Sequence, residues 1–140
     1  MEADNVFFLK ERFPAVSIKE NAVFVPFQSF LPLMEFLHGQ GFDFLYDYTA
    51  VDWPDRFALI CEVRSYSTLD RLAVKTDIAK ENPEVPSLTS LWDSANWLER
   101  EIYDMFGIKF KGHPNLRRIL LEEGYDGYPL RKDYKEGGSK

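Results

Sequence analysis

Three alternating runs of apolar and polar residues in the middle of the chain constrain its fold most strongly. The segments 42–53, 56–66 and 71–78 place apolar or small side chains at every second position. This is the period of a β-strand with one buried face. Short turns separate the runs, and the first turn is the Trp-Pro-Asp-Arg stretch at 53–56. Neighbouring strands joined by short turns pair antiparallel, so the sequence predicts a sheet rich in antiparallel pairs.

Each run also predicts which side chains share the buried face. The expected set is Phe42, Phe44, Tyr46, Tyr48 and Ala50 in the first run, Phe57, Leu59, Cys61 and Val63 in the second, and Leu72, Val74 and Thr76 in the third. Cys61 is the single cysteine, so it forms no internal disulfide, and its place in an apolar run indicates a small buried hydrophobe.

The residues before the first run predict shorter elements. A helix extends to about residue 13, and two short strands flank a polar turn at 19–21. Ser29 is placed to cap a second helix that ends at Gly39 or Gly41. With the helix that follows the sheet, this order predicts an α+β fold: an antiparallel-rich mixed sheet with helices packed on one face.

The last predicted helix starts at Ser87 or Ser90 and ends at Phe106, and Gly107 is its stop signal. Ser90 and Asp93 have the spacing of a capping box in which Asp replaces the usual Glu. An apolar stripe facing the sheet is expected at Leu91, Ala95, Leu98, Ile102 and Met105.

Several polar or aromatic side chains fall outside this stripe. Trp97 projects away from it, as interface anchors on amphipathic helices do, although it would equally cover a local loop. Glu99, Glu101 and Asp104 have the chemistry of paired carboxylates for acid–base catalysis. We interpret them instead as a solvated helix face with ion pairs, including one between Arg100 and Asp104.

The chain changes character after residue 108. Residues 1–108 hold 9 Lys and Arg against 18 Asp and Glu, whereas residues 109–135 hold 7 against 4. The later segment has too many glycines and prolines for a long helix, and its arginines alternate with tyrosines and aliphatic residues. This is the composition of a protein–protein interface core. We therefore divide the chain into a sheet domain, 1–108, and an extended basic docking segment, 109–140.

Other classes of function find little support. The acidic body would repel nucleic acid, and no apolar run is long enough to span a bilayer. There is no cysteine cluster, phosphate loop or dinucleotide fingerprint, and the two histidines lack partners at metal-ligand spacing. His113 precedes a proline and is expected to position or hydrogen-bond rather than catalyse. A small enzyme that uses Asp52, Asp55 and Glu101 is one alternative, and a free-standing binding module is another.

The stretch EREIYDMFGIKFKGHPNLRRIL at 99–120 resembles the signature of the C subunit, or thirty-kilodalton subunit, of NADH-quinone oxidoreductase in the respiratory complex I family. The matching residues are Glu99, Arg100, Glu101, Asp104, Met105, Phe106, His113, Arg117, Ile119 and Leu120. The closing GYDGYPLRKDY resembles the end of that family, which usually has Trp at the place of Tyr125 and often His at Tyr128. VDWPDRF at 51–57 resembles its mid-domain turn.

The resemblance implies a non-catalytic structural and assembly subunit in the hydrophilic arm of the complex. Its partners are the large hydrogenase-like subunit and neighbouring iron–sulfur subunits. NADH, flavin, iron–sulfur clusters and quinone are bound by those partners, and this chain itself carries no cofactor or metal. The place implied is the cytoplasmic face of the cell membrane, reached only through the complex. Related ferredoxin- or F420-linked dehydrogenases and membrane-bound energy-converting hydrogenases share the module and stay open as alternatives.

The composition of the last segment and the resemblance together give a set of expected docking residues. These are Trp97, Glu101, Asp104, His113, Arg117, Arg118, Tyr125, Tyr128, Arg131, Lys132, Asp133 and Tyr134.

Overall fold

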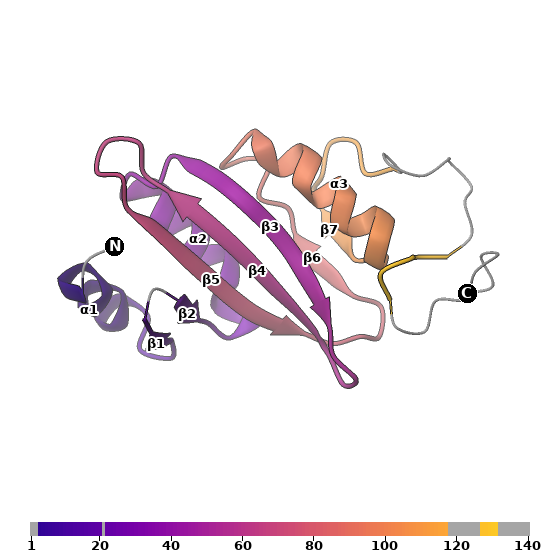
Figure 1. The fold of residues 1–140 in the computed structure, drawn as a ribbon, viewed down its shortest axis with the longest axis horizontal. Helices are drawn as coiled ribbons and strands as arrows, with labels where there is room; N and C mark the ends of the chain where they lie inside the picture. Colours follow the sequence, from indigo (N-terminus) through magenta and orange to yellow (C-terminus); the bar gives the residue numbers. More distant parts are fainter. Residues whose placement is uncertain (1–2, 21, 118–126, 132–140) are drawn as a thin grey trace.

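The computed structural model describes residues 3–20, 22–117 and 127–131. Its elements, in chain order, are α1 (Ala3–Arg12), β1 (Ser17–Lys19), β2 (Ala22–Phe24), the 3-10 turn η1 (Phe27–Ser29), α2 (Phe30–Gly39), β3 (Phe44–Asp52), β4 (Phe57–Arg64), β5 (Arg71–Ile78), β6 (Glu84–Pro86), α3 (Ser94–Phe106) and β7 (Lys109–Lys111) (Figure 1). None of these helices is long and apolar enough to cross a membrane.

The main sheet has five strands in the order β1-β2-β5-β4-β3. The β3–β4 and β4–β5 hairpins and the β1–β2 pair are antiparallel, whereas β2 pairs parallel to β5. Figure 1 shows α2 behind the strands and α3 beside the β3 edge. The predicted α+β class, with an antiparallel-rich mixed sheet, is confirmed.

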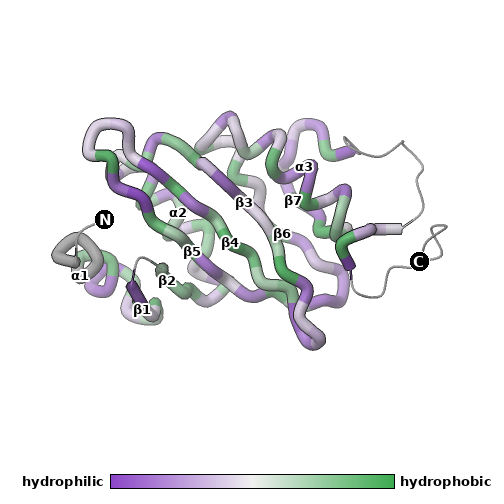
Figure 2. Tube along the Cα trace, in the orientation of Figure 1, coloured by the Kyte–Doolittle hydropathy of each residue, from purple (hydrophilic) through white to green (hydrophobic). Residues whose placement is uncertain are grey.

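The central strand β4 confirms the predicted alternation. Phe57, Leu59, Cys61 and Val63 are fully buried, whereas the residues between them are only half-buried. Apolar residues gather along β4 and α2, and the 53–56 turn is hydrophilic (Figure 2). The buried side chains of the sheet, α2 and α3 form one continuous core. One face of the sheet therefore carries the helices, as the sequence predicts.

Strand β3 does not follow the predicted alternation. Its register with β4 shifts between Leu45 and Asp47, so that Tyr46 is an extra residue and is 49% exposed. Leu45 takes the buried position instead, together with Tyr48 and Ala50. The placement of Phe44 and Tyr46 on the core face was therefore wrong, because a β-bulge breaks the alternation between the residues before it and those after it.

The start of the last helix also differs from the prediction. α3 begins at Ser94, whereas residues 88–92 form a turn in which the Leu91 and Trp92 N–H groups donate to the Leu88 carbonyl. The Ser90–Asp93 capping box was therefore wrong. Ser29 precedes α2 as expected but makes no capping hydrogen bond with its side chain. Gly107 ends α3 as predicted, in the left-handed conformation at φ +76°.

No local pattern indicated the small second sheet. β6 and β7 pair in parallel, with Glu84 opposite Lys109. β7 belongs to the predicted docking segment, so the start of that segment is joined to the body by backbone hydrogen bonds. Phe110, between its two exposed lysines, is buried against the ring of Tyr48. The proposed division at residue 108 stays a prediction.

Candidate docking surface

The interior side of α3 is held by a buried carboxylate. Glu99 is fully buried, and its carboxylate accepts hydrogen bonds from the Leu88 N–H and the Ser87 hydroxyl, both at 2.7 Å. Burial raises the pKa of Glu99 to about 7, although both hydrogen bonds oppose the shift. Glu99 thus fixes the turn before α3 to the helix, and its expected place on a solvated face was wrong.

Asp104 was also expected on the solvent face, and the structure buries it fully. This residue has an interaction partner within the molecule. Glu101, on the same helix, is partly exposed. Among the three acidic residues of α3, Glu101 alone is therefore placed to meet another molecule directly.

The outward side of α3 carries Trp97, which is 55% exposed. The guanidinium carbon of Arg100 lies 5.7 Å from the centre of the Trp97 ring system. Arg100 Nε donates to the Arg117 carbonyl at 3.2 Å, and Arg117 itself is exposed. We call Trp97, Arg100 and Arg117 the Trp97 surface. An exposed indole with an arginine over its ring, and a second arginine bonded to the first through its backbone, has the composition of an interface hot spot.

His113 connects the segment after β7 to the same helix. Its Nδ1 accepts the Asn115 N–H at 2.9 Å, so the ring proton is assigned to Nε2, which donates to the Asn96 carbonyl at 2.9 Å. The predicted hydrogen-bonding role of His113 is confirmed. It holds residues 113–115 against α3 beside the Trp97 surface.

The described residues 127–131 cover the C-terminal end of α3. Leu130 N–H donates to the Met105 carbonyl at 3.0 Å, and Arg131 Nε donates to the Phe106 carbonyl at 2.6 Å. Both carbonyls lack partners within the helix, and a cation at this end is favoured by the helix dipole. The ring of Tyr128 packs over Gly107, where an added Cβ would lie 2.8 Å from it.

The expected docking residues thus fall into two described groups along α3. Trp97, His113 and Arg117 lie near its first turns, and Tyr128 and Arg131 lie at its end. Glu101 and Asp104 lie on the same helix, the first partly exposed and the second buried. The remaining five lie outside the described residues, namely Arg118, Tyr125, Lys132, Asp133 and Tyr134. The docking role of all of them stays a prediction.

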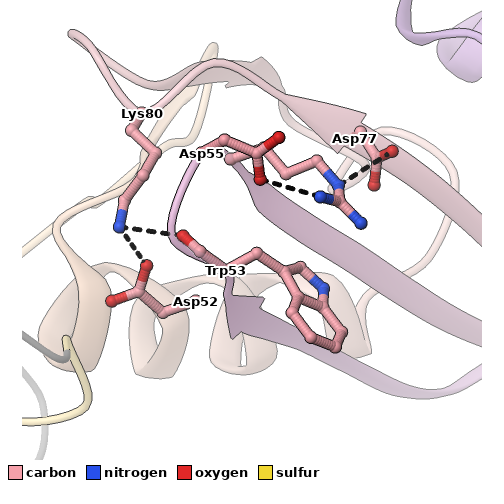
Figure 3. Close-up of polar contacts among 6 residues, drawn as sticks. Asp52, Trp53, Asp55, Asp77 and Lys80 are labelled. Carbon is pink, nitrogen blue, oxygen red and sulfur yellow. Dashed lines mark hydrogen bonds and ion pairs between the residues drawn. The ribbon is translucent and has the colours of Figure 1, made fainter.

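The end of β3 and the turn after it hold two of the three carboxylates of the alternative enzyme hypothesis, Asp52 and Asp55 (Figure 3), whereas Glu101 lies on α3. Asp52 is buried and paired with Lys80, which also donates to the Trp53 carbonyl. The Asp55 side chain is 74% exposed and paired with Arg56. Two carboxylates with separate cationic partners do not form an acid–base pair, which argues against this hypothesis.

Within the described ranges, no group of three or more His, Cys, Asp or Glu side chains could hold a metal ion. Cys61 is buried as expected, and burial raises the pKa of its thiol. It therefore has the environment of an inert core residue rather than that of a reactive thiolate.

Sequence reasoning missed two features of this region. One is the buried Glu99, although its spacing of four, three and seven from Ala95, Ile102 and Phe106 would have placed it on the interior stripe. The other is the approach of Lys80 and Lys109 to Arg131, where they line a common cavity. These three residues are far apart in the chain, so no local pattern signals that they line one cavity.

Comparison with known proteins identifies the family. The model of the respiratory-chain NADH dehydrogenase 30 kDa subunit matches residues 23–140. The C subunit of NADH-quinone oxidoreductase from Moorella thermoacetica is 42% identical, over 93% of this chain and 95% of that protein. The C subunit of the Thermus thermophilus enzyme is also 42% identical, over 82% of this chain and 61% of that protein.

Two solved structures are similar as well. The trypsin-resistant fragment of Nqo5 has a TM-score of 0.72 and 34% identity, over 83% of this chain and all of that fragment. A chain of the membrane-bound sulfane sulfur reductase, an archaeal respiratory membrane complex, shares the fold with a TM-score of 0.81 at 23% identity, over 95% of this chain and 85% of that one. The chain therefore belongs to the 30 kDa subunit family of respiratory-chain NADH dehydrogenases.

Proposed function

We propose that this chain is a non-catalytic structural and assembly subunit in the hydrophilic arm of a complex I-type, ion-translocating NADH-quinone oxidoreductase. It docks on the large hydrogenase-like subunit of the quinone-reducing module. The observation that carries the proposal is the Trp97 surface, in which a half-exposed indole lies on a helix that is otherwise anchored to the core. The names of its relatives as subunits of NADH-quinone oxidoreductase support the assignment to such a complex.

The anchoring of α3 favours docking for a physical reason. Glu99 and Ile102 fix the helix from inside, and His113 and Arg131 fix the segments beside it. A rigid aromatic side chain on a rigid support loses little conformational entropy when a partner covers it. Covering Trp97 therefore costs little in ordering the side chain, which leaves more of the free energy of the contact for binding.

The chemistry of the complex belongs to its other subunits in this proposal. The chain contributes no group to NADH oxidation or quinone reduction, and partner subunits bind NADH, flavin, iron–sulfur clusters and quinone. Its place is the cytoplasmic face of the cell membrane, as a peripheral part of the complex. The segment after residue 109 contributes to docking through its arginines and tyrosines.

A related membrane complex is the second candidate. The fold is shared with a chain of an archaeal respiratory membrane complex. The same docking role is therefore compatible with a ferredoxin- or F420-linked dehydrogenase or an energy-converting hydrogenase. The electron donor is bound elsewhere in each of these complexes, so the proposed role of this chain is the same in all of them.

The test is to purify the full chain, with an affinity tag, from gently solubilised membranes of cells that express it at native level. We expect the large hydrogenase-like subunit and iron–sulfur subunits to co-purify in equal amounts. A flavoprotein that oxidises NADH among them supports the first candidate, and a hydrogenase or ferredoxin-linked module supports the second. Recovery of the chain alone, from the soluble fraction, would refute both.

A further inference from the structure

A basic cavity lies where the loop after β5 meets β7 and the end of α3. Its volume is about 460 Å³, and Lys80, Lys109 and Arg131 line it together with Glu84. Lys80 comes from the acidic residues 1–108, whereas Lys109 and Arg131 come from the basic segment that follows, so the cavity gathers cations from both parts of the chain. The interactions of α3 described above do not explain why these three cations lie around one cavity.

Arg131 is oriented by its neutral surroundings. Its guanidinium carbon lies 5.2 Å from the ring centre of Phe57 and 5.5 Å from that of Tyr128, and its Nε is bonded to the Phe106 carbonyl. Within the described ranges the two terminal nitrogens make no hydrogen bond, and their geometry suits a planar, two-oxygen acceptor. Among the described residues, no carboxylate forms an ion pair with Arg131.

Lys80 and Lys109 add two positive charges to the lining of the same cavity. Lys80 Nζ lies 5.2 Å from the ring centre of Phe57, so Lys80 and Arg131 share one aromatic ring. Lys80 is neutralised by Asp52, whereas Lys109 has no ion-pair partner within the part of the chain that the structure describes. Glu84 opposes Lys109 in the β6–β7 register and offsets one positive charge.

This balance leaves one positive charge in excess at the cavity. A single carboxylate neutralises it, whereas a phosphate group with two negative charges would leave the site negative. The cavity adjoins Gly107 and Arg131, and is thus continuous with the C-terminal part of the proposed docking surface.

We propose that the cavity receives the carboxylate of one Asp or Glu side chain from a neighbouring subunit, bound end-on by Arg131 and flanked by Lys109. The inference deepens the proposed docking function and rests on it. It names the chemistry of one contact: an acidic side chain on a protruding segment of the partner. The partner carboxylate relieves the repulsion between the cations around the cavity.

Zero-length cross-linking of the intact complex with a carbodiimide tests the inference, because this reagent joins a lysine only to a carboxylate in contact with it. We expect mass spectrometry to find Lys109 joined to an Asp or Glu of another subunit. Lys111, two residues further along β7 and exposed, is the internal control. A complex in which Lys109 is unlinked, or linked only to Glu84, would overturn the inference and leave the docking function standing.

Substitutions provide a second measurement on the complex. Lys109→Gln and Arg131→Lys should each speed dissociation of the chain from the complex, about tenfold or more, whereas Lys111→Gln should not. Arg131→Lys keeps the charge and removes the two-nitrogen fork, so it separates geometry from charge. Equal dissociation rates for Lys109→Gln and Lys111→Gln would contradict the proposed contact.

If no partner co-purifies, the docking function is refuted. Carboxylate binding at the cavity can then still be tested on the isolated full chain. The probe is N-acetyl-aspartate amide, followed by NMR at Lys109 and Arg131, with N-acetyl-asparagine amide and inorganic phosphate as controls. Shifts that saturate with the aspartate probe and vanish in Lys109→Gln support a carboxylate site. No shift, or a larger response to phosphate, would overturn it.

Discussion

The carboxylate of Glu99 on α3 accepts the backbone N–H of Leu88 at 2.7 Å, in the fully buried interior of the domain. This contact connects α3 to the turn that follows β6. The same carboxylate accepts the Ser87 hydroxyl, so both residues after β6 are bound to one side chain. This buried acidic group is therefore one of the contacts that set the position of α3 and of the surface it presents.

The stability of the domain should depend on pH through Glu99. Its pKa in the folded state is raised to about 7 by burial, above the ordinary value of 4.5. The protonated form is thus favoured by folding, so this contribution is fully present below pH 4.5 and is lost as pH rises through 7. We expect the free energy of unfolding, measured with urea, to fall by on the order of 3 kcal/mol between pH 4.5 and pH values above 7 because of this group.

Glu99→Gln is the matched variant for this measurement. An amide keeps an acceptor for the Leu88 N–H and a donor for the Ser87 hydroxyl, but it does not titrate. The difference in unfolding free energy between wild type and Glu99→Gln should therefore change in favour of the variant as pH rises from about 5 to about 8. A difference that stays constant over this range would contradict the account of Glu99.

Gly107→Ala should destabilise the domain for two separable reasons. The position has φ +76°, which costs about 1–2 kcal/mol for a residue with a Cβ. The new Cβ would also lie 2.8 Å from the Tyr128 ring. In a Tyr128→Ala background the clash with the ring should disappear, and only the cost of the backbone conformation should remain. A double-mutant cycle, measured by thermal unfolding, gives the free energy of the clash.

Gly39→Ala is the control for that cycle. Gly39 is the last residue of α2, and a Cβ there meets nothing within 4 Å. Alanine is favoured over glycine in helices, so this variant should be neutral or slightly stabilising. If Gly107→Ala were equally neutral, the packing of residues 127–131 on the end of α3 would be wrong.

Lys80→Met should destabilise the fold through the charge it leaves behind. The Asp52 side chain is only 2% exposed and is paired with Lys80, which is itself one-third exposed. Without the Lys80 cation, the buried Asp52 carboxylate has less to balance its charge. We expect the free energy of unfolding to fall by about 2 kcal/mol, which is less than for a fully buried pair because water reaches Lys80. The variant Asp52→Asn/Lys80→Met should recover part of this loss in denaturant unfolding.

Asp55→Asn provides the comparison on the same turn. The Asp55–Arg56 pair is exposed to solvent on the side of the carboxylate. Its removal should change the unfolding free energy by less than about 1 kcal/mol. Similar effects of Asp55→Asn and Lys80→Met would show that burial of Asp52 does not set the strength of its ion pair.

The central hairpins could be predicted from sequence because their alternation is local. β4 and β5 have the expected buried residues, and the 53–56 turn lies where proline and aspartate predicted it. β3 could not be predicted in full, because a bulge at Tyr46 adds one residue without any change in composition. Alternation alone does not reveal a one-residue shift of register.

On the candidate docking surface, too, features set by local sequence could be predicted, whereas those set by residues distant in sequence could not. Trp97 could be placed on the outer side of α3 from helical period alone, and His113 could be assigned a hydrogen-bonding role from its neighbour Pro114. Glu99 and Asp104 were misplaced because charged residues are usually exposed, and the burial of Glu99 depends on Ser87 and Leu88, which lie outside its helix. The parallel β6–β7 pair was missed for two reasons. Each strand has only three residues, and the two strands are far apart in the sequence.

The most direct test of the account is the affinity of Trp97→Ala and Arg117→Ala variants for the large hydrogenase-like subunit, measured with purified components. We expect each variant to keep the wild-type melting temperature and to bind about tenfold more weakly or worse, because each removes a side chain from the Trp97 surface only. Arg118→Ala, which lies outside the described residues, is expected to weaken assembly in the same way. Normal assembly of these variants combined with loss of electron transfer would contradict the docking role and require a direct one.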